Sequence, residues 1–217
     1  MKDQTLIAHD LTIARGDLEL CSHVNFTLSS GQILHLYGQN GIGKTTLLMM
    51  LSGLIPVTPS SESFLKWGEV LPSDWSVLYL GHLAGLSAGL SVRENLRFLH
   101  ALNSPSQHDL DHALNQVGLS GYDNIPVSKL SSGQKRRATL ARLWLSDDVN
   151  QLWLLDEPWT ALDTAMSKRL NERLIAFTAQ GGRIILTNHQ PMSIATNRLN
   201  LKEFARQHDE IDPMSAY

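Results

Sequence analysis

The chain has 217 residues, of which 42% are hydrophobic and 18% charged, and its formal net charge is −3. Such a chain can bury the core of one large globular domain, and its slight acidity disfavours nucleic acid as a partner, because nucleic-acid-binding proteins usually carry a strong basic excess. The single cysteine, Cys21, excludes an internal disulfide, and no stretch approaches the roughly 18 consecutive apolar residues of a membrane-spanning helix.

The first part of the sequence is typical of short β-strands. A turn at residues 15–17 separates two pairs of apolar segments, and a Ser-Ser-Gly break follows them at 29–31. The expected strands lie at 6–8, 11–13, 18–20 and 24–28. The residues before and among them include the acidic Asp3 and Asp10 and form no long apolar run, so we expect no secretory leader.

A buried strand at residues 33–37 and a helix over 44–51 are expected to flank a glycine-rich loop. This loop, GQNGIGKT at 38–45, fits the pattern G-x-x-x-x-G-K-[ST] (Walker A) in full. Its backbone N–H groups and the N-terminus of the helix would bind phosphate oxygens. Lys44 would reach the β- and γ-phosphates as a catalytic residue, and Thr45 offers a hydroxyl to Mg²⁺. The nucleotide-binding residues expected here are Gly38, Gln39, Asn40, Gly41, Ile42, Gly43, Lys44, Thr45 and Thr46.

The middle of the chain is mostly helical in character. Ser91 with Glu94 three residues later predicts a capping box that opens a helix over 91–102, and a second amphipathic helix is expected over 107–117. Two helices with few strands indicate a small helical subdomain, at about 85–145, inserted between two parts of an α/β core.

The last third alternates between helices and strands. Helices are expected over 132–145 and 166–180, and buried strands over 151–157 and 183–189. Alternation of this kind predicts a mostly parallel sheet that is covered by helices on both faces.

Two adjacent carboxylates end the buried strand at 151–157. Because successive side chains of a strand point to opposite sides, Asp156 and Glu157 should have different roles. We expect Asp156 to join Thr45 at Mg²⁺, and Glu157 to act as the general base for an attacking water, a role worth roughly 10²–10⁴ in rate.

The segment LSSGQ, residues 130–134, resembles the LSGGQ signature of the ABC ATPases, with Ser132 in place of a glycine. As in that family, a basic triplet and a helix follow it. The resemblance covers about residues 5–204 and implies an α/β fold, a P-loop NTPase of ABC ATPase type. Such a fold has a mostly parallel core sheet, an N-terminal antiparallel β subdomain and an inserted helical subdomain. The whole chain, 1–217, would be a single nucleotide-binding domain.

The same resemblance implies an ATP site shared between two chains. Ser131, the N–H of Gly133 and the N-terminus of the following helix would form a second anion-binding surface. In the resembled family this surface meets the γ-phosphate bound on the opposite subunit, so we expect a homodimer that holds two ATP molecules head to tail. The signature residues assigned to the ATP site are Ser131, Ser132, Gly133 and Gln134.

Two further segments match the family at the expected spacing. TALD at 160–163 resembles the D-loop, in which Asp163 would contact the partner subunit at the nucleotide site. His189, after the strand RIILTN, resembles the switch histidine, a catalytic residue that binds the γ-phosphate and positions the attacking water.

Two positions depart from the family pattern. Leu83 stands where the Q-loop glutamine is expected, and because leucine cannot ligate metal, His82 or water is expected to replace that glutamine. No aromatic residue precedes Phe26 to stack on adenine, and Arg15, with its planar guanidinium, is the candidate for that contact.

Within the family, the sequence is similar to the ATP-binding subunits of bacterial cytochrome c maturation complexes, which are described as haem exporters. The similar segments are 90–100, 125–137, 140–145, 152–163 and 187–191. The resemblance implies peripheral attachment to the cytoplasmic face of the inner membrane through integral membrane subunits. ATP hydrolysis would drive haem export or the release of a haem-loaded chaperone. The sequence has no Cys-x-x-Cys-His, so we expect no direct haem binding.

Three alternatives remain open at the level of sequence. The chain could serve a different ABC exporter or importer. It could be a soluble ABC ATPase that acts on nucleic acid or ribosomes, although the only basic cluster, residues 135–137, is interpreted as the solvated face of the signature helix. A P-loop kinase is the third, and both LSSGQ and TALD argue against it.

Overall fold

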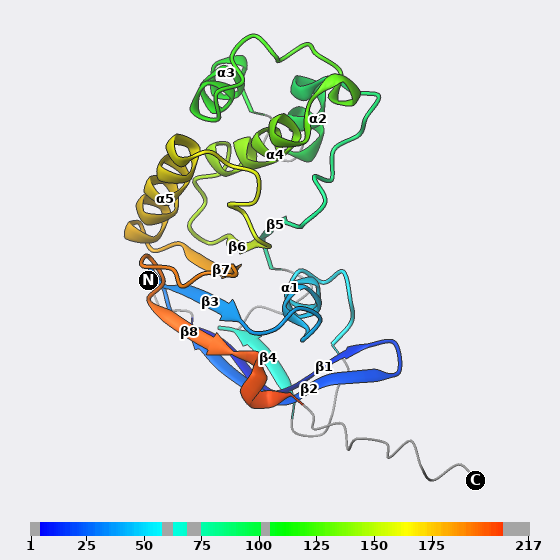
Figure 1. Cartoon of the computed structure of the whole chain (residues 1–217). Coiled ribbons are helices and arrows are strands. Elements are labelled where there is room, and N and C mark those ends of the chain that lie inside the picture. The colour runs from blue at the N-terminus through cyan, green and yellow to red at the C-terminus, as the bar shows by residue number, and fades with distance from the viewer. Residues whose placement is uncertain (1–4, 58–62, 69–74, 101–104, 206–217) are drawn as a thin grey trace, which may run out of the picture.

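A five-stranded sheet forms the centre of the protein in the computed structural model, which describes residues 5–57, 63–68, 75–100 and 105–205 (Figure 1). The strand order is β5-β6-β7-β3-β8, and every neighbouring pair is parallel. The strands are β3 (Ile33–Tyr37), β5 (Val77–Leu80), β6 (Leu152–Leu155), β7 (Arg183–Thr187) and β8 (Asn197–Asn200). The predicted parallel core sheet is therefore confirmed, although β8 was not foreseen.

A second, antiparallel sheet has the order β2-β1-β4. Its strands are β1 (Leu6–Arg15), β2 (Leu18–Leu28) and β4 (Phe64–Trp67). The expectation of four short strands before residue 29 was wrong, because they join into two long ones. Asp10 and His23 adopt positive φ where the register shifts, and their side chains are 2.6 Å apart, so the apparent breaks are β-bulges in continuous strands.

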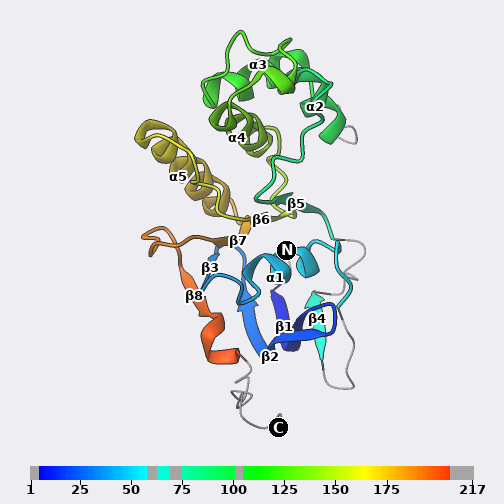
Figure 2. The same ribbon diagram turned by 45° about the vertical axis from the view of Figure 1, so that its right-hand side comes forward.

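The helix α1 (Lys44–Leu51) lies between the two sheets (Figure 2). Leu47, Leu48 and Leu51 of α1 are buried with Leu34 and Leu36 of β3 in one core, which also includes the inner faces of β1 and β2. The alternate residues of each central strand belong to a second core on the other face of the sheet. This packing fixes the start of α1 at the carboxyl end of β3, as predicted.

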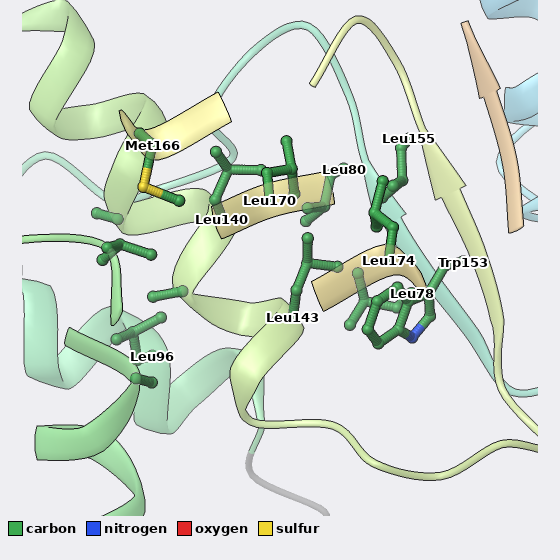
Figure 3. Close-up of a cluster of buried hydrophobic side chains, with 14 of the residues drawn as sticks. Leu78, Leu80, Leu96, Leu140, Leu143, Trp153, Leu155, Met166, Leu170 and Leu174 are labelled. Atoms are coloured by element: carbon green, nitrogen blue, oxygen red, sulfur yellow. The ribbon is translucent and has the colours of Figure 1, made fainter. Parts of the chain in front are cut away.

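The second core joins the sheet to four helices. These are α2 (Val92–Leu99), α3 (Gln107–Gln116), α4 (Ser132–Leu140) and α5 (Thr164–Ala179). Figure 3 shows Leu80 of β5 close to Leu170 of α5, and Leu155 of β6 close to Leu174 of the same helix. The helical segment thus shares its core with the sheet, and the subdomain limits of about 85 and 145 stay a prediction.

The helix boundaries follow their caps. Ser91 and Glu94 form the predicted capping box, and α2 ends at Leu99, while the predicted extension to 101–102 lies outside the described residues. α4 is shorter than predicted, because the turn Ala141–Trp144 is a 3₁₀ helix. Two further 3₁₀ turns are Val127–Lys129 and Leu201–Phe204. Among the residues that the structure describes, no helix is both long enough and apolar enough to span a membrane.

Candidate functional site

The loop between β3 and α1 has a backbone that only glycine adopts easily. Gly38, Gly41 and Gly43 have φ angles of 147°, 82° and 112°. A Cβ atom on Gly43 would also approach Ile13 Cγ2 to 3.0 Å, so the β1 strand leaves no room for a side chain there. The loop therefore turns tightly into α1, whose N-terminal N–H groups and partial positive charge favour an anion.

Lys44, the first residue of α1, lies across this loop. Its Nζ donates hydrogen bonds to the carbonyl oxygens of Gly38 at 2.8 Å and Gln39 at 2.9 Å. Burial lowers the pKa of Lys44, and the carboxylates of Glu157 and Asp156 oppose that shift. The lysine is thus held where the loop, the helix and both acidic residues converge.

Asp156 binds two threonine hydroxyls. Thr45 Oγ1 donates to Asp156 Oδ2 at 2.7 Å, and Thr187 Oγ1 donates to Asp156 Oδ1 at 2.6 Å. Because its proton is directed at Asp156, Thr45 keeps its oxygen lone pairs for another partner. A hydroxyl oxygen backed by a carboxylate suits Mg²⁺, which prefers oxygen ligands whose orientation is fixed by outer partners.

Glu157 faces the same site by a route that strand alternation did not predict. β6 ends at Leu155, and Glu157 has a φ of +47°, a left-handed conformation that is rare for residues other than glycine. Its backbone N–H donates to Thr187 Oγ1 at 2.9 Å, and its Oε1 is 2.8 Å from Nε2 of His189. Asp156 and Glu157 therefore point in different directions because of a turn that follows β6, and not because side chains alternate along a strand.

His189 follows β7 and has a half-exposed side chain. Asn188 is the residue before His189, and its backbone carbonyl oxygen lies 3.1 Å from Nε2 of His35, which is buried on β3. Burial lowers the pKa of His35, so the ring is neutral and donates through Nε2. This contact ties the segment that carries His189 to the strand that precedes the glycine loop.

A cavity of about 560 Å³ opens over the loop, and Lys44, Thr45 and Glu157 line it. Its size is in the range of small-molecule sites. Arg15, the candidate for an adenine contact, lines the same cavity and is exposed there. The other lining residues are Leu18, Leu20, Asn40, Gly41, Gly43, Thr46, Met49 and Ile55, of which the apolar ones were not foreseen.

The signature segment lies elsewhere. Ser131 caps α4: its Oγ accepts from Gln134 N at 3.2 Å, and its own N–H donates to Gln134 Oε1 at 2.9 Å. Ser131 and Ser132 are exposed. In both views α4 lies on the other side of β5 and β6 from α1, so one chain does not bring its signature to its own glycine loop (Figures 1 and 2).

The D-loop aspartate has a local structural contact. Asp163 is exposed and caps α5, accepting a hydrogen bond from Met166 N at 2.8 Å. Gly133 of the signature is near this loop, since a Cβ on it would lie 3.5 Å from Ala161 O. The signature and the D-loop therefore present neighbouring surfaces.

Two residues of the site were missed by sequence reasoning. Arg136 donates to the carbonyl oxygens of Gly81 (2.9 Å), Asp156 (2.9 Å) and Glu157 (2.7 Å), and it is only 8% exposed. The interpretation of the basic triplet as a solvated face was thus wrong for this residue. The available sequence signal for burial of Arg136 was its position four residues before Leu140, since residues four apart lie on the same face of a helix and Leu140 is buried.

Thr187 is the second missed residue, since it bridges Asp156 and the Glu157 backbone. Its place in the buried strand expected over 183–189 was the only sequence signal. The two cases share a cause, because each residue acts on a segment that is distant in sequence.

Comparison with known proteins gives a consistent result. The model of the ABC transporter family matches residues 21–160. The chain is 41% identical over 199 residues to the cytochrome c biogenesis ATP-binding export protein CcmA of Escherichia coli (strain K12), covering 89% of this chain and 93% of that protein. It is 43% identical over 192 residues to CcmA 2 of Salmonella paratyphi A (strain ATCC 9150 / SARB42), covering 86% and 90%. Among solved structures, an ABC transporter ATP-binding protein of Pyrococcus furiosus superposes with a TM-score of 0.80 at 21% identity, covering 93% of this chain and all of the other.

Proposed function

Because this chain belongs to the ABC transporter family, whose ATP-binding proteins hydrolyse ATP, we propose that it is the ATPase subunit of a cytochrome c biogenesis export complex. The relatives at 41–43% identity carry that description in their names. The observation that carries the catalytic assignment is the 2.8 Å contact between Glu157 and His189 beside the glycine-loop cavity.

In the proposed reaction the glycine loop binds the phosphates through its backbone N–H groups, and Lys44 binds the terminal ones. Lys44 would then exchange its bonds to Gly38 and Gln39 for charge-assisted bonds to phosphate. Glu157 accepts a proton from the attacking water, and His189 orients Glu157 through their mutual hydrogen bond before binding the γ-phosphate.

Thr45 and Asp156 would hold Mg²⁺. Thr45 would supply its hydroxyl oxygen, and Asp156 would fix that hydroxyl and add negative charge behind it. When bound, the ion would neutralise charge that develops on the phosphates.

The second half of each ATP site would come from another copy of the chain. Ser131 and Ser132 are exposed at the N-terminus of α4, apart from the glycine loop of the same chain, and would form an anion-binding surface there. A head-to-tail homodimer would place this surface on the γ-phosphate held by the partner. The exposed Asp163, next to the signature, would lie in that interface.

The complex would reside at the cytoplasmic face of the bacterial inner membrane. We propose that integral membrane subunits attach this chain there, and that its ATP hydrolysis drives haem export or release of a haem-loaded chaperone. Haem would be bound by those partners, and the chain itself would bind neither haem nor nucleic acid.

The variant Glu157→Gln tests the proposal, because it keeps the shape of the side chain and removes its ability to accept a proton. ATP hydrolysis should fall by roughly 10²–10⁴. The variant should still bind ATP and, in gel filtration with ATP and Mg²⁺, elute as a dimer. A variant that remains monomeric, or that hydrolyses ATP normally, contradicts the mechanism.

The biological role is tested with the same variant in bacteria whose related ATP-binding protein has been deleted. The wild-type chain should restore covalent haem in c-type cytochromes, as measured by haem staining of gels, and should co-purify with integral membrane subunits. Glu157→Gln should co-purify equally and restore no haem. Co-purification with another exporter, or with ribosomes, would instead favour the alternatives of a different ABC complex or a soluble ABC ATPase.

A further inference from the structure

A second cavity of about 340 Å³ opens beside Thr45 at the carboxyl end of β5. Much of its lining is apolar, and Leu83, at the position of the missing Q-loop glutamine, is 83% exposed. The lining residues with a bearing on what enters the cavity are Thr45, Tyr79, His82, Leu83, Thr139 and Arg142. The cavity therefore borders the hydroxyl that is predicted to bind metal, which also lines the cavity over the glycine loop.

Most polar side chains of this cavity are already engaged. Thr45 donates to Asp156, and Thr139 Oγ1 donates to the carbonyl oxygens of Ala84 and Lys135. Arg142 donates to the carbonyl oxygen of Tyr79 at 3.1 Å. Within the described residues the hydroxyl of Tyr79 has no hydrogen-bond partner, so it is a donor available to whatever enters the cavity.

The position of the Tyr79 ring is closely determined. Leu78 and Leu80 face the second core, so Tyr79 faces α1, the helix that carries Thr45. A Cβ atom on Gly81 would lie 2.9 Å from the Tyr79 hydroxyl oxygen. Only glycine at position 81 therefore allows the ring to extend past Leu80 towards the end of the sheet.

Burial and charge also favour the protonated form of the Tyr79 hydroxyl, which is the form that can donate. Burial raises its pKa, and the nearby negative charge of Asp156 raises it further, to about 12. The phenol thus keeps its proton at neutral pH, and it lies within the electrostatic influence of Asp156, the carboxylate that accepts the Thr45 hydroxyl.

We propose that the Tyr79 hydroxyl is a positioning residue at the metal side of the ATP site, where it donates a hydrogen bond to the water shell of the magnesium–nucleotide bound at Thr45. This inference rests on the proposed function. Leu83 has no polar group for this task, and His82 lines the cavity with an exposed side chain. Tyr79 thereby performs from β5 what an amide at position 83 would perform from the following loop.

Equilibrium ATP binding, with Mg²⁺ and with EDTA, tests the inference. Tyr79→Phe removes only the hydroxyl, and it should raise the Kd for ATP in Mg²⁺ by about 3–10-fold, the effect of one hydrogen bond. The Kd in EDTA should remain unchanged. Adding Leu83→Gln to Tyr79→Phe should restore the affinity in Mg²⁺, because the glutamine amide can enter the same cavity.

Three outcomes overturn the inference: an unchanged Kd in Tyr79→Phe, an equal loss with and without Mg²⁺, and a selective loss in His82→Ala but not in Tyr79→Phe. Thermal melting of each variant controls for folding. Failure of the wild-type chain to bind ATP at all would contradict the proposed function and not this assignment alone.

Discussion

Thr187 connects the two acidic residues of the site, and its role can be isolated by a substitution of nearly equal shape. Thr187→Val removes the donor to Asp156 and the acceptor for the Glu157 N–H. A buried group left without a partner costs about 1–3 kcal/mol, so urea denaturation should show a loss of that size. The catalytic rate should fall at least about tenfold, since the orientation of Glu157 is lost.

Thr187→Ser is the matched control, because it keeps the hydroxyl. It should retain most of the activity and lose stability only through the missing methyl group. Equal activity in the valine and serine variants would show that the hydroxyl does not orient Glu157.

Among individual residues, those that neighbouring sequence identifies were predicted. Those whose hydrogen-bond partners lie far away along the chain were not. The glycine loop, Glu157 and His189 were assigned because each follows a strand at a fixed spacing, and the structure brings them together. Arg136 binds carbonyls 20 to 55 residues away, and nothing near it in sequence reveals those partners.

At the scale of elements, the end of α2 carries a titratable group that links stability to pH. His100 is buried at the C-cap of α2, and burial, with the charge of Arg142, lowers its pKa to about 4 from 6.5. Above pH 6.5 both folded and unfolded chains are neutral there. Between pH 6.5 and 4 the unfolded chain binds a proton at His100 and the folded chain does not. As the pH falls through this range, the free energy of unfolding should therefore decrease by up to about 1.4 kcal/mol per pH unit.

Urea denaturation from pH 7.5 to 4 measures this dependence, and His100→Leu is the control. The difference between the pH profiles of the two proteins isolates His100 from the other histidines. Below pH 4 the contribution should level off. Parallel profiles for the wild-type chain and His100→Leu would contradict the assignment.

The success of prediction also varied by element. The strands β3, β6 and β7 were predicted because they are continuous apolar runs, as buried parallel strands are. β8 (Asn197–Asn200) is polar and only partly buried, so it has no hydrophobic pattern of its own. The bulges of β1 and β2 place polar residues within strands and so imitate turns.

At the scale of the whole molecule, a shared ATP site predicts that two inactive variants complement each other. Lys44→Ala disables the glycine loop, and Gly133→Asp places a negative charge at the signature. Each alone should be inactive as a homodimer. A mixture should regain about a quarter of the wild-type rate, because about half of randomly assorted dimers are mixed and each contains one complete site.

Gly133→Ala is the control, since a Cβ there meets its nearest neighbour at an ordinary 3.5 Å. It should remain active. The mixture of Lys44→Ala and Gly133→Asp decides the question. If each of these two variants keeps the wild-type melting temperature and their mixture stays inactive, the ATP site is not shared between chains.

The order of strands in the central sheet has a consequence for how the protein is made. β3 emerges early from the ribosome, but its neighbours are β7 and β8, which are synthesised last. At about 5–20 residues per second, the roughly 150 residues between β3 and β7 take about 8–30 s to translate, during which both edges of β3 are unpaired. A ribosome that stalls before residue 183 therefore releases a chain that contains the glycine loop but lacks β7 and β8, the two strands that pair with β3. Such truncated products should be substrates for chaperones and proteases, and not partial enzymes.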